Sequence, residues 1–159
     1  MEHEMHRKGE IQSPHYGRLL LMIVLSFVAM YILMYAMVDR LDNVIPNFNQ
    51  FYMAGLMAAP MLVLELLLMG NMYPNKKLNS VLMVVGVVVA LVFWFLIRQQ
   101  VAIGDRQFLK SMIPHHAGAI LMCEQSRPKD PEIRQLCQKI LNSQRAEIAL
   151  MKEKLKGEG

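Results

Sequence analysis

The segment Leu19–Val38, with the sequence LLLMIVLSFVAMYILMYAMV, decides the fold, and it lies between Arg18 and Asp39. It contains no charge and is about as long as a helix that crosses roughly 30 Å of hydrocarbon. A signal peptide would have a shorter apolar region followed by a small-residue cleavage site, which this segment lacks. We therefore predict a membrane-spanning helix that is retained.

Two further apolar runs, Phe51–Met69 and Val81–Ile97, predict a second and a third membrane helix. The composition agrees, since 54% of the 159 residues are hydrophobic, 19% are charged and the mean hydropathy is +0.27. The second run contains one carboxylate, Glu65, which makes it a candidate intramembrane site. Because an ionised carboxylate is costly at this depth, we expect Glu65 to face other helices or water.

The orientation of the chain across the membrane is predicted from the Lys and Arg residues near the ends of the spans, because these residues resist translocation and stay on the cytoplasmic side. They are slightly more numerous around the N-terminus and the loop after the second span than on the other side. This bias predicts a cytoplasmic N-terminus and an extracytoplasmic C-terminal part, in a plasma or inner membrane. We expect no nucleic-acid binding, because acidic residues alternate with the basic ones of the last helix.

The segment after the spans predicts two antiparallel helices joined by one turn. Asp130 followed by Pro131 is a helix start, since the carboxylate accepts a bond from a first-turn amide and proline has the helical φ. The predicted domains are a polar arm at 1–18, a transmembrane region at 19–98 and a hairpin at 105–156. The predicted fold class is all-α, with three transmembrane helices and this C-terminal hairpin. A short turn pairs Cys123 with Cys137, His116 with Gln144 and Met112 with Ile148.

A hairpin of about fifty residues is too small to bury a full core of its own. A second hairpin from another copy could complete it as a four-helix bundle at a homodimer interface. Packing against the membrane helices is the alternative.

The motif MIPHHAGAILM at 112–122 carries the chemistry. Pro114 removes a backbone donor and bends the helix beside His115 and His116. Imidazole and thioether ligands within one turn suit a soft or borderline metal, copper above all, with Cu(I) favoured where methionine contributes. A histidine pair alone is more often a packing or interface feature, and that interpretation stays open.

With this motif and with Gln144, Glu147, Ile148 and Met151, the segment from Asp105 to Met151 resembles the domain of unknown function 305 family. Members of that family are ferritin-like helical bundles associated with copper or silver. Many have a secretory signal and a longer or duplicated bundle, whereas this chain has three spans and one hairpin. The resemblance implies a metal-binding set of Met112, His115, His116 and Met122, completed by Gln144, Glu147 and Met151.

Two smaller features of the sequence concern the cysteines and the N-terminus. Cys123 and Cys137 are predicted to form a disulfide outside the cytoplasm, while ligation of Cu(I) by the thiols and two unpaired core thiols remain alternatives. At the N-terminus, His3 is in the position where an amino group, two amides and an imidazole can enclose Cu(II).

The sequence contains no Glu-x-x-His in the hairpin, no His-Glu-x-x-His and no glycine-rich phosphate loop, so we expect no enzyme. The leading hypothesis is a membrane-anchored Cu(I)- or Ag(I)-binding protein of metal tolerance or trafficking, with copper-transport partners. The alternative is a structural membrane assembly module whose hairpin mediates oligomerisation without metal. A small transporter using Glu65 is a third hypothesis.

Overall fold

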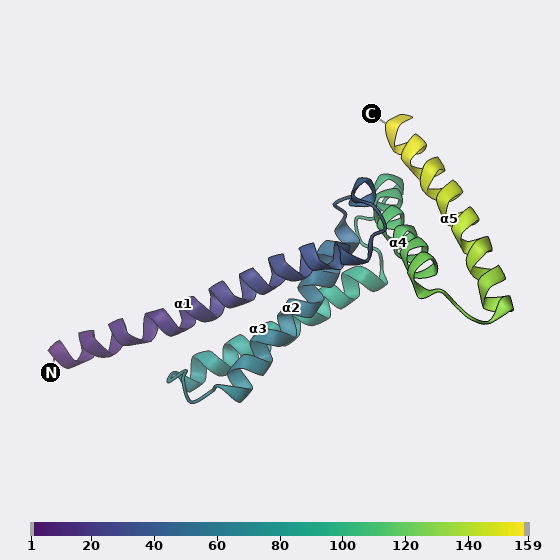
Figure 1. Ribbon diagram of the computed structural model, residues 1–159. Coiled ribbons are helices and arrows are strands. Elements are labelled where there is room, and N and C mark those ends of the chain that lie inside the picture. The colour runs from purple at the N-terminus through teal and green to yellow at the C-terminus, as the bar shows by residue number, and fades with distance from the viewer. Residues whose placement is uncertain (1, 158–159) are drawn as a thin grey trace. The chain divides into compact units, whose positions relative to one another are not determined.

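The protein is described by a computed structural model that covers the backbone of residues 2–157 and the side chains of residues 15–157. Within this range all regular structure is helical, which confirms the predicted fold class. The elements are α1 (Glu2–Leu33), the 3-10 helices η1 (Met34–Met37) and η2 (Leu41–Asn43), α2 (Phe48–Leu68), α3 (Lys76–Arg98), α4 (Asp105–Ser126) and α5 (Pro131–Gly157) (Figure 1).

Three helical segments are long and apolar enough to cross a membrane: His15–Met37, Phe48–Leu68 and Lys76–Arg98. Each overlaps one of the three predicted spans. Residues 2–18 of the predicted polar arm are also helical, since α1 begins at Glu2.

The chain forms two compact units, each built from segments that are far apart in the sequence. The membrane unit comprises 1–32 and 51–99, and the hairpin unit comprises 33–50 and 100–159. The segment 33–50 therefore belongs with the hairpin, although it follows the first span. Two of the candidate spans, α2 and α3, separate the two parts of the hairpin unit in the sequence, and the predicted topology places both parts on one side of the membrane.

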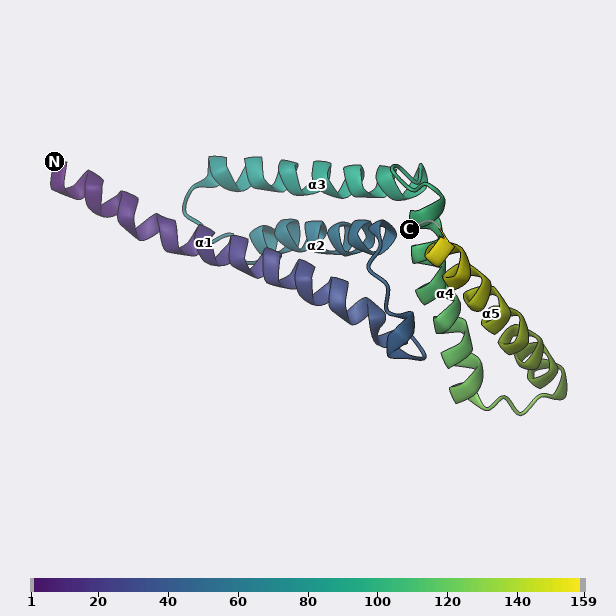
Figure 2. The same ribbon diagram turned by 90° about the horizontal axis from the view of Figure 1, so that it is seen from above.

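Small residues allow α2 to approach α3 closely in the membrane unit, and the two helices lie side by side in both views (Figures 1 and 2). Ala58 and Ala59 of α2 are buried. A Cβ atom added at Gly86 of α3 would lie 2.9 Å from Cγ2 of Val63, and one added at Gly55 of α2 would overlap the ring of Phe93. Close backbone approach of this kind is typical of helices packed in membranes.

Replacing Gly55 by leucine should therefore destabilise the membrane unit by about 1–3 kcal/mol, because the new side chain has to displace the Phe93 ring. The thermal midpoint of the full-length protein in detergent micelles, followed by circular dichroism, measures this effect. The matched control is Gly17→Leu, since a Cβ atom at Gly17 would have no neighbour within 4 Å. Equal midpoints for the two variants would show that Gly55 is not needed for close packing.

Glu65 has a protein partner, as expected. The hydroxyl of Tyr73 donates to Glu65 Oε1 at 3.1 Å, and Tyr73 itself is buried in the loop after α2. Asn79 joins the same cluster, because its Nδ2 donates to the Tyr73 carbonyl at 2.9 Å and its Oδ1 accepts from the Tyr16 hydroxyl at 2.8 Å. Glu65 thus belongs to a hydrogen-bonded cluster of polar side chains near the end of α2. A role for it in ion movement stays a prediction.

The hairpin is built as its sequence signals indicate. Asp130 Oδ1 accepts from the backbone N–H groups of Glu132 at 2.7 Å and Ile133 at 3.2 Å, which confirms the predicted start of α5. Arg127 ends α4 in the left-handed conformation, with φ of 45°. The helices α4 and α5 then run back along each other (Figure 2).

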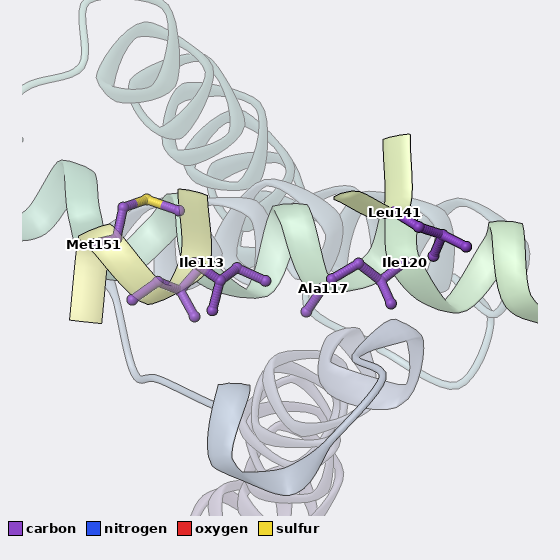
Figure 3. Packing of buried hydrophobic residues seen from close by; sticks show 6 residues of the cluster. Ile113, Ala117, Ile120, Leu141 and Met151 are labelled. Carbon is purple, nitrogen blue, oxygen red and sulfur yellow. The ribbon is translucent and has the colours of Figure 1, made fainter. Parts of the chain in front are cut away.

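The core of the hairpin unit lies between α4 and α5 (Figure 3). Its buried members are Ile113, Ala117, Ile120, Leu141, Ile148 and Met151. Val38 and Ile45 pack against this cluster, so the segment after the first span supplies part of the apolar cover. The two sources of cover expected from the sequence, a second copy or the membrane helices, do not include this segment.

Candidate functional site

His116 is the best-defined residue of the predicted metal-binding set. It is buried on α4, and its Nδ1 lies 2.8 Å from the carbonyl oxygen of Met112 while its Nε2 lies 2.7 Å from Glu147 Oε2 on α5. A carbonyl can only accept, so Nδ1 donates. The Glu147 carboxylate can only accept as well, so a proton on Nε2 would donate to Oε2.

Glu147 is held as a carboxylate in this pair. The hydroxyl of Ser143 donates to Oε1, and this bond, followed by the bond from His116, lowers the pKa of Glu147 below its ordinary value. The predicted register placed Gln144 opposite His116, whereas the observed partner is Glu147, three residues further along α5. A carboxylate bonds to an imidazolium more strongly than a neutral amide does, which accounts for the difference.

The other predicted ligands divide between two faces of the hairpin. Met112 and Gln144 are half-buried, and Met151 is buried beside Ile113 in the core (Figure 3). His115 is exposed, and so is Met122, which is 53% exposed. The rings of His115 and His116 are 6.0 Å apart between centroids. The inner face therefore presents His116 and Met112 with Glu147, and the outer face presents His115 and Met122.

Among the side chains of residues 15–157, no group of three or more His, Cys, Asp or Glu residues comes together in a way that could hold a metal ion. The donors near the imidazoles in this part of the chain are therefore Glu147 and the predicted methionine ligands. The predicted site at His3 lies outside the described side chains.

The two cysteines do face each other, as the predicted register requires. Cys123 on α4 and Cys137 on α5 are both half-buried free thiols. Burial, followed by the neighbouring thiol of Cys137, raises the pKa of Cys123 to about 11. The disulfide itself stays a prediction.

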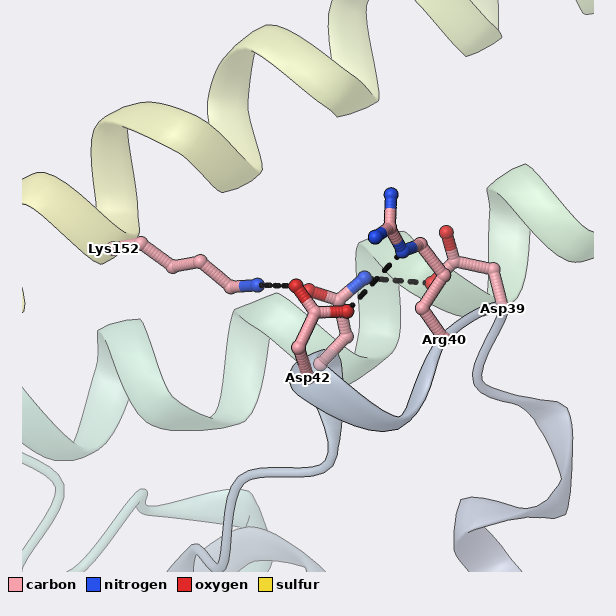
Figure 4. Close-up of polar contacts among 5 residues, drawn as sticks. Asp39, Arg40, Asp42 and Lys152 are labelled. Atoms are coloured by element: carbon pink, nitrogen blue, oxygen red, sulfur yellow. Dashed lines mark hydrogen bonds and ion pairs between the residues drawn. The ribbon is translucent and has the colours of Figure 1, made fainter.

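A charged cavity of about 410 Å³, which the sequence analysis missed, lies between the segment after the first span and the two hairpin helices. Lys152 Nζ of α5 is 2.9 Å from Asp42 Oδ2, and Arg40 Nε is 3.3 Å from Asp42 Oδ1 (Figure 4). A second ion pair joins Arg145 to Glu124. Asp42 and Lys152 are 110 positions apart, and no local pattern in the sequence connects them.

The ion pair with Lys152 lowers the pKa of Asp42 below its ordinary value of 3.8, mainly through the hydrogen bond from Nζ. Because this pKa is lowered on folding, the stabilisation is present above pH 3.8 and is lost as the pH falls through the folded-state value. We expect Lys152→Met to move the Asp42 titration midpoint upward, toward 3.8. Carboxyl NMR shifts of the full-length protein report it directly, with Lys154→Met as the control. An unchanged midpoint in Lys152→Met would show that the pair does not form.

These features define a class of protein: an all-α chain with three candidate membrane spans and a helical hairpin that carries a His-His motif. Residues 96–155 match the family described as "Domain of unknown function (DUF305)". The chain is also 35% identical over 133 residues to "Uncharacterized protein L153" of Acanthamoeba polyphaga mimivirus, covering 82% of this chain and 86% of that protein. The chain therefore belongs to the same family as this viral protein, and its residues 96–155 carry the domain of unknown function 305. No solved structure matches it.

Proposed function

We propose that this protein is a membrane-anchored copper-binding protein, not an enzyme, whose hairpin holds Cu(I) or its mimic Ag(I) for metal tolerance or trafficking. Neutral imidazoles bind borderline metals, and thioether sulfur shifts the preference toward softer monovalent ions. The proposed ligands are Met112, His115, His116 and Met122, with Gln144, Glu147 and Met151 as further candidates on α5.

The observation that carries this proposal is the orientation of His116. Its Nδ1–H donates to the carbonyl of Met112, which holds the ring with Nε2 directed toward α5. Histidines that bind metals almost always donate their second ring N–H to a carbonyl, carboxylate or water. A metal ion at Nε2 would take the place of the contact with Glu147, and protons compete with the metal ion for this nitrogen. Binding would therefore release a proton and weaken in more acidic solution.

The outer ligands support a site shared between two copies. His115 and Met122 are exposed on one helix, which cannot surround an ion by itself. A second hairpin would supply the missing donors, so we propose a homodimer. Copper-transport proteins that deliver or receive the ion are the proposed partners. The same proposal places the hairpin on the extracytoplasmic side of a plasma or inner membrane and makes the Cys123–Cys137 disulfide its oxidised form.

One observation supports the alternative of an assembly module that works without metal. Several large apolar side chains of the hairpin unit are about half exposed, and a partner chain could cover them. They are Phe108, Met122, Ile133, Leu136 and Leu150.

A competition titration separates the two functions. The full-length protein in detergent micelles is titrated with Cu(I) against a chelator, beside a variant that combines His115→Ala and His116→Ala, while light scattering follows the oligomeric state. We expect the double variant to bind at least about 100-fold more weakly. Equal binding by the two proteins would refute the copper function. A dimer that forms without metal in both would then support the assembly module.

A further inference from the structure

A cavity of about 330 Å³ lies within the membrane unit, where α2 ends and α3 begins. Its volume falls in the range of roughly 300–1,000 Å³ that is usual for small-molecule sites. It shares no residue with the proposed copper ligands or with the charged cavity of the hairpin unit. This cavity is therefore a separate candidate site, and its lining determines what it can hold.

The lining of this cavity combines apolar and polar side chains. The apolar ones include Leu67, Leu68 and Met83, and the polar ones include Asn71, Lys76 and Ser80. Leu67 is 63% exposed and Leu68 is 79% exposed, so both side chains can contact a ligand. A ligand that touches both kinds of residue needs a polar head and an apolar chain, as a membrane lipid has.

Lys76 supplies the positive charge of the cavity, and a backbone contact holds it there. Its Nζ donates to the carbonyl oxygen of Gly70 at 3.0 Å, and Gly70 is itself a lining residue. Because an ammonium group has three N–H donors, two remain for a ligand. The side-chain amide of Asn71 adds further N–H donors to the lining. The polar part of the cavity is thus suited to accepting groups such as phosphate oxygens.

No carboxylate in the adjoining sequence opposes this charge. The chain contains no Asp or Glu from residue 66 to residue 104, whereas Lys76 and Lys77 are neighbours at the start of α3. Glu65 does not line the cavity, and its carboxylate accepts a hydrogen bond from the hydroxyl of Tyr73. The head of a complementary ligand is therefore anionic.

The place of the cavity along the membrane helices indicates the source of that anion. It lies where the candidate span Phe48–Leu68 ends and the candidate span Lys76–Arg98 begins, which is the level of lipid headgroups. Basic pockets between membrane helices bind anionic headgroups. In the predicted orientation this end of the spans faces the cytoplasm, where the membrane leaflet carries anionic lipids.

We propose that this cavity binds one anionic phospholipid, with its phosphate beside Lys76 and an acyl chain along Leu67 and Leu68. The lipid is held by charge, hydrogen bonds and apolar contact, and no covalent bond changes. The site is independent of the proposed copper function, because it uses none of the same residues.

The test is native mass spectrometry of the full-length protein in detergent micelles, titrated separately with dioleoylphosphatidylglycerol and dioleoylphosphatidylcholine. These lipids have the same acyl chains and differ in the net charge of the headgroup. We expect the wild-type protein to bind the first phosphatidylglycerol about fivefold more tightly than phosphatidylcholine, which is the size expected of one lysine beside an anionic lipid. The Lys76→Gln variant should lose this preference.

The matched control is Lys77→Gln, which removes the same charge one position further along from a residue that does not line the cavity. It should keep the preference for phosphatidylglycerol. A second variant, Ser80→Phe, changes no charge and should weaken the binding of both lipids, because the ring occupies the cavity. Circular dichroism checks that the variants fold.

Equal binding of the two lipids by the wild-type protein would overturn the proposal, and so would a preference that persists in Lys76→Gln. An equal loss of preference in Lys76→Gln and Lys77→Gln would also overturn it, since diffuse attraction to the loop would then explain the binding. Unchanged lipid binding by Ser80→Phe would show that the lipid lies elsewhere. Inorganic phosphate, added as a competitor, should not displace the lipid, and displacement would show that the cavity holds a free anion instead.

Discussion

The His116→Ala variant is expected to bind Cu(I) at least about 100-fold more weakly than the wild-type protein, and the His115→Ala variant only about tenfold more weakly. His116 is buried, and two hydrogen bonds fix its ring, so it is already oriented before an ion arrives. His115 is exposed on the neighbouring face, so it has to be ordered when the ion binds. The entropy lost in that ordering reduces the contribution of His115 to the free energy of binding.

Chelator competition on the full-length protein measures both variants, and Cys123→Ser with Cys137→Ser in the background removes copper bound to the thiols. The control is His15→Ala, which removes an imidazole from the membrane unit and should leave the affinity unchanged. If His115→Ala were the weaker binder, the ion would be held on the exposed face with Met122. The contact between His116 and Glu147 would then only hold α4 and α5 together, without binding metal.

The Ile120→Ala variant is expected to lose about 2–5 kcal/mol of stability in the hairpin unit. Ile120 is 2% exposed and lies in the cluster between α4 and α5 (Figure 3). Shortening it removes buried methyl and methylene groups and leaves a cavity that the two helices can close only in part. Urea unfolding of the full-length protein, followed by circular dichroism and by amide exchange in α4 and α5, measures the loss.

The comparison variant is Ile133→Ala on α5, where the side chain is 51% exposed. It should change the stability by no more than about 0.5 kcal/mol, as is usual for surface positions. An equal loss in both variants would indicate that Ile133 is covered by another chain, which would favour the assembly module.

The elements could be predicted because their signals are local. Leu19–Val38 is apolar over its whole length, and the capping of α5 by Asp130 depends on residues two and three positions later. The contact of Cys123 with Cys137 was also predictable, because a short turn determines the pairing of the two helices.

The parts that could not be predicted depend on contacts between distant residues. No pattern marks 33–50 as part of the hairpin unit, since Val38 and Ile45 look like ordinary apolar residues near the end of a span. The choice of Glu147 over Gln144 required the position of the ring of His116, which the spacing of residues along two helices does not determine. The division of the ligands between two faces likewise required the burial of each side chain.

The hairpin unit combines an early segment of the chain with two later helices, and this determines when its core can form during synthesis. Val38 and Ile45 leave the ribosome long before α4 and α5 exist, and the two intervening helices, α2 and α3, are synthesised in between. The first part of the core therefore stays uncovered until α4 and α5 have been translated, and unsatisfied apolar surface exposes a nascent chain to aggregation and to chaperones. Interrupting α5 would leave Val38 and Ile45 without part of their cover, so a late helix decides whether an early segment is protected.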